Sequence, residues 1–566
     1  MIIVLLIALG GGMVAKKLRQ PILTGYLISG ILVTGLFGRF LHFTSAQALA
    51  DLGLAFLMFV VGLDFSFRRL ARVKRIAVGG AILQMLLTVI ILAILGLTGL
   101  FGSLSPAEVI VAAVAFSLSS TAIVIKLLSE KGELDTLPAE ILVGWLLVQD
   151  LAVVPILTVL PVLSAGGPII SVLAGIFLSL LKAAVLLYLV LFLGKKVVPI
   201  FFTKVAEINS REILLLATVS LVLISAAVTY ALGLSFALGA FLAGLLVADN
   251  IAQHAVFSEI RPLRDIFAVI FFVTLGVLLS PVFIWQNWLT ILIVSLAVIM
   301  IKFFLVLLIT VNFKYHLKTA LQVGLSLTLV SEFAFVIARL ALNNGAIGQN
   351  AYSLILAVTM VTMMVSPWEF GLSVGIYEKL RNSAAKWSPR IYKMFFNSFD
   401  HYRKEHKEIE IANHVVICGH GRVGRHIARI MAMAGVPYVV VDYNHNVISD
   451  LEMQGVETVL GDPTDKEVLQ FAGVSRAGAV VAAVPDRYSQ ELIIENALSL
   501  KPGITIICRS HFEEDQRRLY ALGVSAVVSP EFEAGLSMGH RILDSMGFER
   551  NKTAAYLKMA RREQGI

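Results

Sequence analysis

Long apolar runs separated by short polar loops fill the chain as far as residue 378, and short β-branched runs follow from residue 414. A helix that crosses a bilayer needs about 20 consecutive apolar residues, and about thirteen stretches meet this requirement. The predicted spans are residues 1–15, 22–41, 46–67, 76–101, 107–129, 138–163, 169–201, 212–231, 235–250, 265–280, 286–312, 318–342 and 350–376. The pattern therefore predicts a polytopic α-helical membrane protein in its first two thirds.

The loops between these spans alternate between strongly basic and nearly uncharged sequences. Basic loops lie on the cytoplasmic side of a membrane, so the alternation supports the predicted order of spans. Arg39 is the one basic residue that falls in the opposite set of loops. An odd number of spans with this bias predicts an integral plasma (inner) membrane protein with its N-terminus outside and everything after residue 378 in the cytoplasm.

The pattern changes again after the last span. Residues 379–412 are charged with interleaved aromatic residues, which is typical of an amphipathic connector at a membrane surface. Residues 413–546 alternate β-branched runs such as HVVIC and YVVVD with helical stretches, the pattern of a Rossmann-like α/β domain. We therefore expect a membrane domain over residues 1–378, the linker, the α/β domain and a C-terminal tail over residues 547–566.

Composition narrows the partners and the class of protein. The 566 residues are 58% hydrophobic and 15% charged, with a mean hydropathy of +0.86, so the lipid bilayer is the main surroundings of the chain. The net charge of +8 is explained by the basic loops, and no nucleic-acid partner is expected. Two cysteines, Cys418 and Cys508, are too few for a disulfide framework or a four-ligand metal site.

A glycine motif opens the α/β domain. Gly419, Gly421 and Gly424 have the G-x-G-x-x-G spacing directly after a strand, and Asp442 ends the next strand. Such glycines let backbone approach a phosphate at a helix N-terminus, and an acid at that position accepts hydrogen bonds from a ribose. The alternative is a tight turn that binds nothing. With no second domain to hold a reducible substrate, the domain is predicted to sense a nucleotide rather than to act as an enzyme.

A lone carboxylate interrupts the apolar stretch LLVQDLAVVP, where Asp150 lies near the middle of a predicted span. A charge at this depth is costly and is functional by default. One carboxylate can hold a proton or a cation but not both, which is the chemistry of an antiporter. The alternative is a structural pair with Lys302, which also lies mid-span and which could equally serve as a structural counter-ion.

Two predicted spans contain small polar breaks, SLSSTAIVIKLL and SLTLVSEFAFVIARL. They are an odd number of spans apart and so cross the membrane in opposite directions. Matched broken helices in opposed orientation predict an inverted-repeat transporter with its ion site between the repeats. The alternative is that the hydroxyls only bond their own helix backbone. Glu332, in the second stretch, is either a structural partner of Lys302 or Arg339 or a transport residue.

Taken together, the motifs resemble the monovalent cation:proton antiporter-2 family, and within it the Kef-type potassium efflux antiporters with a cytosolic TrkA-N-like nucleotide-binding domain. The motifs that carry the resemblance are GYLISG (25–30), DLGLAFLMFVVGLDF (51–65), SLSSTAIVIKLL (117–128), VQD (148–150), SFALGAFLAGLLVAD (235–249), PLRDIFAVIFFVTLGV (262–277), SEFAF (331–335) and CGHGRVGR (418–425). The resemblance implies a homodimer, two crossing broken helices at the ion site and a regulatory cytosolic domain. It leaves an accessory regulatory subunit and control by glutathione open.

By position, the resemblance makes Asp150 the ion-binding and proton-carrying residue, with Gln149 beside it. Thr121 and Ser120 would supply oxygens to K⁺ at Asp150, and Lys302 and Glu332 would be supporting charges in the membrane. A single carboxylate beside a neutral amide favours electroneutral exchange, and a weakly charged site favours K⁺, which is cheaper to dehydrate than Na⁺.

In the soluble domain, the resemblance assigns the phosphates to the three glycines together with Arg422 and Val423. Asp442 would bind the ribose, and Asp462 would lie on the adenine side. The implied ligand is an adenine nucleotide, either AMP or NAD(H), and the residues do not choose between the two.

These observations favour a secondary active K⁺/H⁺ antiporter, a potassium efflux system gated by nucleotide, with a Na⁺/H⁺ antiporter of the same fold as the alternative. A ligand-gated potassium channel is a weaker alternative, because the chain has no TVGYG-like filter sequence. A membrane-bound dinucleotide oxidoreductase is disfavoured, since hydride transfer needs a substrate site and an acceptor.

Overall fold

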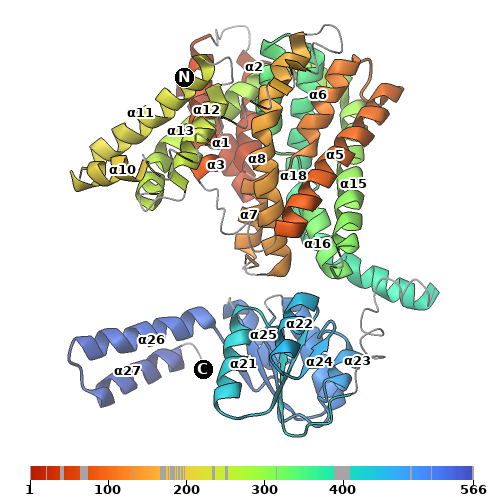
Figure 1. Ribbon diagram of the computed structural model, residues 1–566, viewed down its shortest axis with the longest axis vertical. Coiled ribbons are helices and arrows are strands. Elements are labelled where there is room, and N and C mark those ends of the chain that lie inside the picture. Colours follow the sequence, from red (N-terminus) through yellow and green to blue (C-terminus); the bar gives the residue numbers. More distant parts are fainter. Residues whose placement is uncertain are drawn as a thin grey trace. The chain divides into compact units, whose positions relative to one another are not determined.

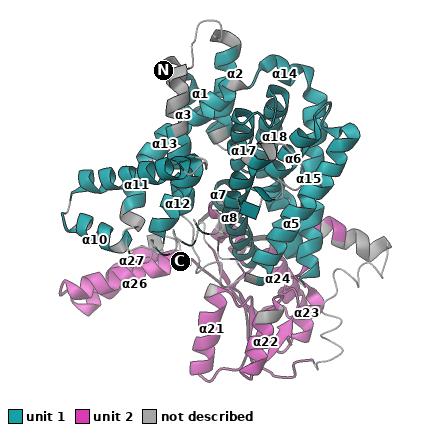
Figure 2. Cartoon of the chain, turned by 45° about the horizontal axis from the view of Figure 1, so that its top comes forward, with its two compact units in different colours: residues 1–127, 137–314, 318–373 teal, residues 128–136, 315–317, 374–566 magenta. Residues whose placement is uncertain are grey.

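The computed structural model describes residues 2–37, 44–63, 74–165, 198–231, 236–248, 253–387 and 408–563, apart from residues 19, 21, 132, 135, 209, 314, 485, 486, 511 and 512, with single helical residues between 174 and 196. The chain forms two compact units, coloured separately in Figure 2. The first comprises residues 1–127, 137–314 and 318–373, and the second residues 128–136, 315–317 and 374–566.

The first unit is wholly helical in its described residues. Its helices are α1 (Ile2–Lys17), α2 (Ile22–Phe37), α3 (Thr44–Leu63), α5 (Lys74–Leu95) with the π-turn η1 (Gly96–Leu100), α6 (Pro106–Ser117), α7 (Thr121–Glu130), α8 (Leu137–Ala165), α10 (Val198–Glu207), α11 (Arg211–Ala231), α12 (Phe236–Ala248), α13 (Gln253–Leu278), α14 (Pro281–Gln286), α15 (Trp288–Asn312), α16 (Leu317–Ser326), α17 (Phe333–Asn343) and α18 (Gln349–Trp387). Six helical segments among the described residues are long and apolar enough to cross a membrane, and α2, α3, α12 and α17 contain shorter apolar helices. The predicted span over residues 169–201 lies largely outside the described residues, so the count of thirteen stays a prediction.

Two predicted spans are broken, as the polar stretches within them indicated. Residues 118–120, here the first break, separate α6 from α7, and residues 327–332, the second break, separate α16 from α17. The start of α6 is specified locally, because Ser105 and Glu108 form a reciprocal capping box and Pro106 is the first residue of the helix. Its end is not specified by a cap, and the backbone groups freed there must find partners elsewhere in the protein.

Helix α18 runs nine residues beyond the predicted end of the membrane domain, to Trp387. The connector predicted from residue 379 therefore begins as helix. The residues KLRNSAAKW contain no Gly or Pro and several strong helix formers, so nothing in their sequence stops the helix at residue 378. Residues 388–407, the rest of that connector, lie outside the described residues.

Glycines bring the membrane helices into close backbone contact. A Cβ added at Gly244 on α12 would collide with the carbonyl oxygen of Phe59 on α3, and one added at Gly62 on α3 would collide with that of Phe241. Helices α2 and α13 meet in the same way at Gly30 and Gly276. In a bilayer, such contacts are what holds helices together, because lipid tails are as apolar as the side chains.

The second unit contains a parallel six-stranded sheet in the order β3-β2-β1-β4-β5-β6. The strands are β1 (Val415–Cys418), β2 (Tyr438–Asp442), β3 (Thr458–Leu460), β4 (Ala479–Ala482), β5 (Thr505–Arg509) and β6 (Ala526–Val528), and the helices are α21 (Arg422–Met433), α22 (His445–Met453), α23 (Lys466–Phe471), α24 (Arg487–Leu500), α25 (Glu513–Ala521), α26 (Pro530–Ser545) and α27 (Arg550–Glu563). The strand order confirms the predicted Rossmann-like domain, and it reverses between β1 and β4, where such sheets bind their ligands. Cys418 and Cys508 are both buried as free thiols in its core.

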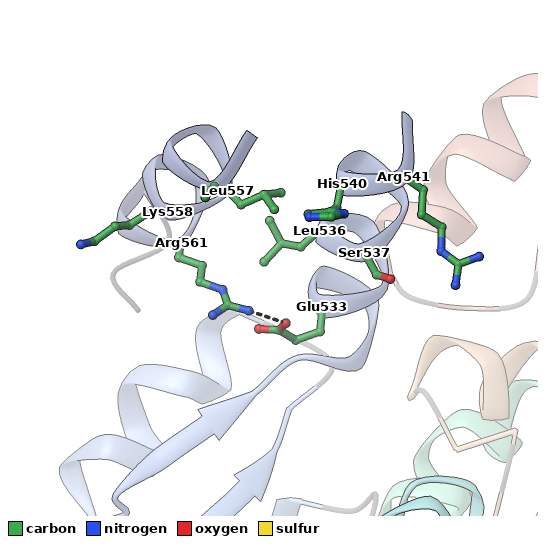
Figure 3. A pocket seen from close by; sticks show the side chains of 9 residues that line it. Glu533, Leu536, Ser537, His540, Arg541, Leu557, Lys558 and Arg561 are labelled. Carbon is green, nitrogen blue, oxygen red and sulfur yellow. Dashed lines mark hydrogen bonds and ion pairs between the residues drawn. The ribbon is translucent and has the colours of Figure 1, made fainter. Parts of the chain in front are cut away.

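The predicted C-terminal tail contains helix α27, which packs against α26 (Figure 1). Figure 3 shows Leu536 of α26 and Leu557 of α27 facing each other across a pocket, with Arg561 bound to Glu533 at 2.8 Å.

The glycine contact between α3 and α12 is testable with one methyl group. Gly244→Ala should lower the melting temperature of the full chain in detergent, because the two helices must separate, at a cost of about 1–3 kcal/mol. Gly10→Ala in α1 is the matched control, since a Cβ there meets nothing within 4 Å. Equal melting temperatures for the two variants would contradict the close contact.

Candidate functional site

The two breaks lie against each other. The Ser331 amide donates a hydrogen bond to the Leu118 carbonyl at 3.1 Å, and the Ser119 hydroxyl donates to the Leu327 carbonyl at 2.8 Å. Each break thus supplies partners for backbone groups that the other leaves without a helical partner. For Ser119, the alternative that the hydroxyls bond only their own helix backbone is wrong, because its hydroxyl bonds to a carbonyl 208 residues away in the sequence.

Lys302 joins both breaks from α15. Its amine is fully buried and donates to the carbonyl oxygens of Leu118 and Leu329, both at 2.8 Å. The Leu118 carbonyl directly follows α6, whose helix dipole favours positive charge at this end, and the Leu329 carbonyl lies within the second break. The Lys302 amine therefore bonds to main-chain oxygens and does not form the direct pair with Asp150 that was the alternative.

Asp150 lies in the middle of α8 and is 3% exposed. Its Oδ2 accepts a hydrogen bond from the hydroxyl of Thr121, the first residue of α7, at 2.8 Å. Glu332, at the end of the second break, lies close enough to interact electrostatically with Asp150 and is hydrogen-bonded to Ser120. The structure therefore brings together four of the predicted site residues, which come from α7, α8 and the two breaks.

Glu332 carries an oxygen with no partner in the described protein. The residue is only 4% exposed, and its buried Oε2 makes no hydrogen bond to the described residues. A buried polar oxygen without a partner is costly, so a proton or a bound ion would stabilise it. Of the two roles open for Glu332, the geometry therefore favours one at the ion site.

Gln149 faces a different set of partners from its neighbour Asp150. Its Oε1 accepts from the Ser119 amide at 2.8 Å, and its Nε2 donates to Oε1 of Gln84 on α5 at 2.6 Å. Gln84 in turn donates to the Ser117 carbonyl at the end of α6, at 3.0 Å. Both ends of the Gln149 amide are therefore engaged in holding the first break against α8 and α5.

Sequence reasoning missed two residues of this region, Gln84 and Glu369. Gln84 is a lone amide in the apolar run ILQML, and Glu369 is a lone acid in SPWEFG, in the middle of α18 and near the end of its apolar part. Both carry the signal that singled out Asp150, a polar residue in an apolar span. Glu369 accepts a hydrogen bond from the hydroxyl of Thr328, in the second break, at 2.5 Å.

The three glycines of the soluble domain have three separate roles. Gly419 ends β1 with a φ of +94°, a conformation that favours glycine. A Cβ at Gly424 would collide with the carbonyl oxygen of Gly419, so this glycine lets α21 pack against the turn. Gly421, which precedes α21, has no atom within 4 Å of a Cβ position, so the space over the helix N-terminus is open to a phosphate.

The carboxylate of Asp442 braces this turn. It accepts hydrogen bonds from the amides of His420 and Asn444, both at 2.8 Å, and each oxygen keeps capacity for a ribose hydroxyl. Burial raises the pKa of Asp442, the two amides oppose that effect, and the charge of Asp462 adds to it. Asp462 is buried nearby and accepts from the amide and hydroxyl of Thr464, at 2.9 and 2.7 Å.

Two further residues predicted for the phosphates lie at the start of α21. Val423 is partly buried there, while the side chain of Arg422 lies outside the described residues. The fit to a nucleotide thus rests on the open space at Gly421, the free helix N-terminus and the position of Asp442. These features suit a phosphate and a ribose.

Comparison with known proteins identifies a family for each of the two parts of the chain. Residues 2–371 match the family described as sodium/hydrogen exchanger, transmembrane. The chain belongs to this family. Residues 415–530 match the TrkA-N domain, which covers the sheet and the glycine turn.

Individual relatives cover almost the whole chain. It is 31% identical over 547 residues to the putative cation/proton antiporter YbaL of Escherichia coli strain K12, covering 93% of this chain and 94% of the relative. It is 30% identical over 540 residues to the glutathione-regulated potassium-efflux system protein KefC of Escherichia fergusonii, covering 94% and 83%. The predicted resemblance to Kef-type antiporters is confirmed.

One solved structure matches the membrane unit. The sodium proton antiporter MjNhaP1 from Methanocaldococcus jannaschii covers 66% of this chain and 97% of its own length, with a TM-score of 0.51 at 16% sequence identity. The likeness shows that the membrane unit has the cation/proton antiporter fold. The predicted fold class, an antiporter domain followed by a Rossmann-like domain, is thereby confirmed.

The separate roles of the glycines predict different effects of one added methyl group. Gly424→Ala should lower the unfolding temperature of the soluble domain, measured by calorimetry on the full chain, because the new Cβ forces α21 away from the turn. Gly421→Ala, in the same motif, should leave that temperature nearly unchanged because its Cβ enters open space. If the two variants were equally unstable, the assignment of the open space to Gly421 would be wrong.

Proposed function

We propose that the protein is a secondary active antiporter that exchanges K⁺ for H⁺ with no net charge movement, and that nucleotide binding to its soluble domain gates the exchange. The observation that carries the proposal is the position of Asp150. It is a buried acid in the middle of α8, beside the crossing of two broken helices, and its hydrogen-bond partner is a hydroxyl.

Exchange follows from competition at this carboxylate. A proton or a cation neutralises the Asp150 charge, and each excludes the other from the buried site. The Thr121 hydroxyl donates to the ionised carboxylate, and its oxygen is free to turn toward a bound cation. Only a neutralised site is cheap to move through the low dielectric of the membrane, so an empty site does not cross and the two fluxes are coupled.

Electroneutral stoichiometry needs one charge to change per cycle. Gln149 is neutral, and its amide is engaged by Ser119 and Gln84. The proposal requires that Glu332 keep one protonation state through the cycle. Asp150 is then the one group that alternates between proton and cation.

Potassium is the preferred ion on two grounds. A site built from one ionised carboxylate and hydroxyl oxygens offsets only a small dehydration free energy, and K⁺ has a smaller dehydration free energy than Na⁺. Relatives include proteins named as potassium efflux systems. Na⁺/H⁺ exchange is the second candidate, favoured by the description of the matched family as a sodium/hydrogen exchanger.

Regulation is assigned to the TrkA-N domain. The open space at Gly421 and the N-terminus of α21 suit a phosphate, and Asp442 suits a ribose, so an adenine nucleotide such as AMP or NAD(H) is the expected ligand. We expect a homodimer in the inner membrane with its N-terminus outside and the nucleotide domain in the cytoplasm. This arrangement would let cytoplasmic nucleotide control efflux.

Asp150→Asn should abolish exchange, because the amide can neither release a proton nor neutralise a cation. The measurement is proton movement in proteoliposomes when K⁺ and then Na⁺ is added, with Glu207→Gln, an exposed acid on α10, as the control. Retained exchange in Asp150→Asn would remove this residue from the mechanism. A K⁺ current without proton movement in the wild type would indicate a channel instead.

Gly421→Val should abolish nucleotide binding while the chain keeps its fold, because the side chain fills the space over the α21 N-terminus. Calorimetric titration of the full chain with AMP and with NADH measures this, and Gly539→Val on exposed α26 serves as the control. The ligand with the tighter wild-type binding is assigned to the domain. Unchanged affinity in Gly421→Val would place the ligand elsewhere.

A further inference from the structure

Glu369 is a buried acid to which the exchange mechanism above gives no role. It lies on α18, is 8% exposed, and accepts a 2.5 Å hydrogen bond from the Thr328 hydroxyl. Thr328 belongs to the second break and is followed by Leu329, whose carbonyl binds the Lys302 amine. Consecutive residues of one break thus hold an acid from α18 and an amine from α15.

The buried charges around the crossing fall into two separate groups. Lys302 and Glu369 contact neighbouring residues of the second break, Leu329 and Thr328. Asp150 instead contacts Thr121, the first residue of α7. Two carbonyl oxygens give Lys302 hydrogen-bond partners but only partial charges. A buried ammonium needs a full opposite charge as well, because an uncompensated ion is strongly disfavoured in the membrane interior.

We propose that Glu369 is the fixed counter-charge of Lys302, a positioning residue that keeps the lysine cation from neutralising Asp150. Asp150 then has a proton or a transported cation as its neutralising partner, and the lysine keeps its charge throughout the cycle. The inference deepens the proposed function and rests on it, since it explains why one charge changes per cycle in a site that contains a buried lysine.

The test uses isosteric variants that remove one charge or both. In Glu369→Gln the amide can still hydrogen-bond to Thr328, while Lys302 loses its counter-charge. The uncompensated cation favours the ionised form of Asp150 and repels K⁺. The acid limb of the pH profile for K⁺-driven proton movement should therefore move to lower pH by about one unit, and the apparent KM for K⁺ should rise.

Three further variants separate charge from structure. Lys302→Gln leaves Glu369 uncompensated and should shift the acid limb to higher pH. The double variant Lys302→Gln with Glu369→Gln has no uncompensated charge and should return toward the wild-type profile, and Glu369→Asp should keep it. An unshifted profile in Glu369→Gln, or a double variant no closer to wild type than the single variants, would overturn the proposal.

A second readout does not depend on transport. In a double-mutant cycle of melting temperatures in detergent, the double variant should be more stable than the sum of the two single effects predicts. Additive effects would contradict the counter-charge even if exchange behaved as expected. Conversely, a wild type without cation/proton exchange would overturn the proposed function, while the cycle would still decide whether Glu369 balances Lys302.

Discussion

The crossing of two broken helices is the constraint on which the membrane unit depends. Breaking a helix inside a bilayer leaves amide and carbonyl groups without partners, and no water is present to replace them. This protein meets that demand with the breaks themselves and with Lys302, whose amine binds a carbonyl from each. The same arrangement positions Thr121 at the start of α7, beside the Asp150 carboxylate.

Two kinds of contact hold the membrane helices together. At the crossing, Gln84 of α5 bonds to the last residue of α6, and Gln149 of α8 and Glu369 of α18 bond to the breaks. Elsewhere in the unit, glycines such as Gly62 and Gly244 allow backbones to touch. Glycine contacts therefore join helices away from the ion site, whereas hydrogen bonds join the helices that meet at the breaks.

The soluble domain uses glycine for a different purpose. In its first turn, Gly419 takes a left-handed conformation, Gly424 allows a helix to approach, and Gly421 leaves space. Only the last of these features serves a ligand directly. The turn shows why the spacing of such a motif is more informative than any one of its glycines, since all three conditions must hold for a phosphate to reach the helix N-terminus.

By itself, the sequence determined the division into a membrane part and an α/β part, the two broken spans, the position of Asp150 inside an apolar span and the glycine motif. These conclusions depend on local properties, namely the hydropathy of a stretch, the spacing of glycines and the cost of a charge in an apolar run. The sequence did not show that α18 continues to Trp387. The residues at that boundary are polar, which suggests a linker, but their helix propensity is strong.

Only the tertiary structure decided which groups meet. Lys302 had two plausible acidic partners in the sequence, Asp150 and Glu332, and the fold instead gave it two carbonyl oxygens. The fold also brought Glu369 to the neighbouring residue of the same break. The bond from Lys302 to Leu118 joins residues 184 positions apart. Contacts over such separations depend on how whole helices pack, and neither hydropathy nor residue spacing contains that information.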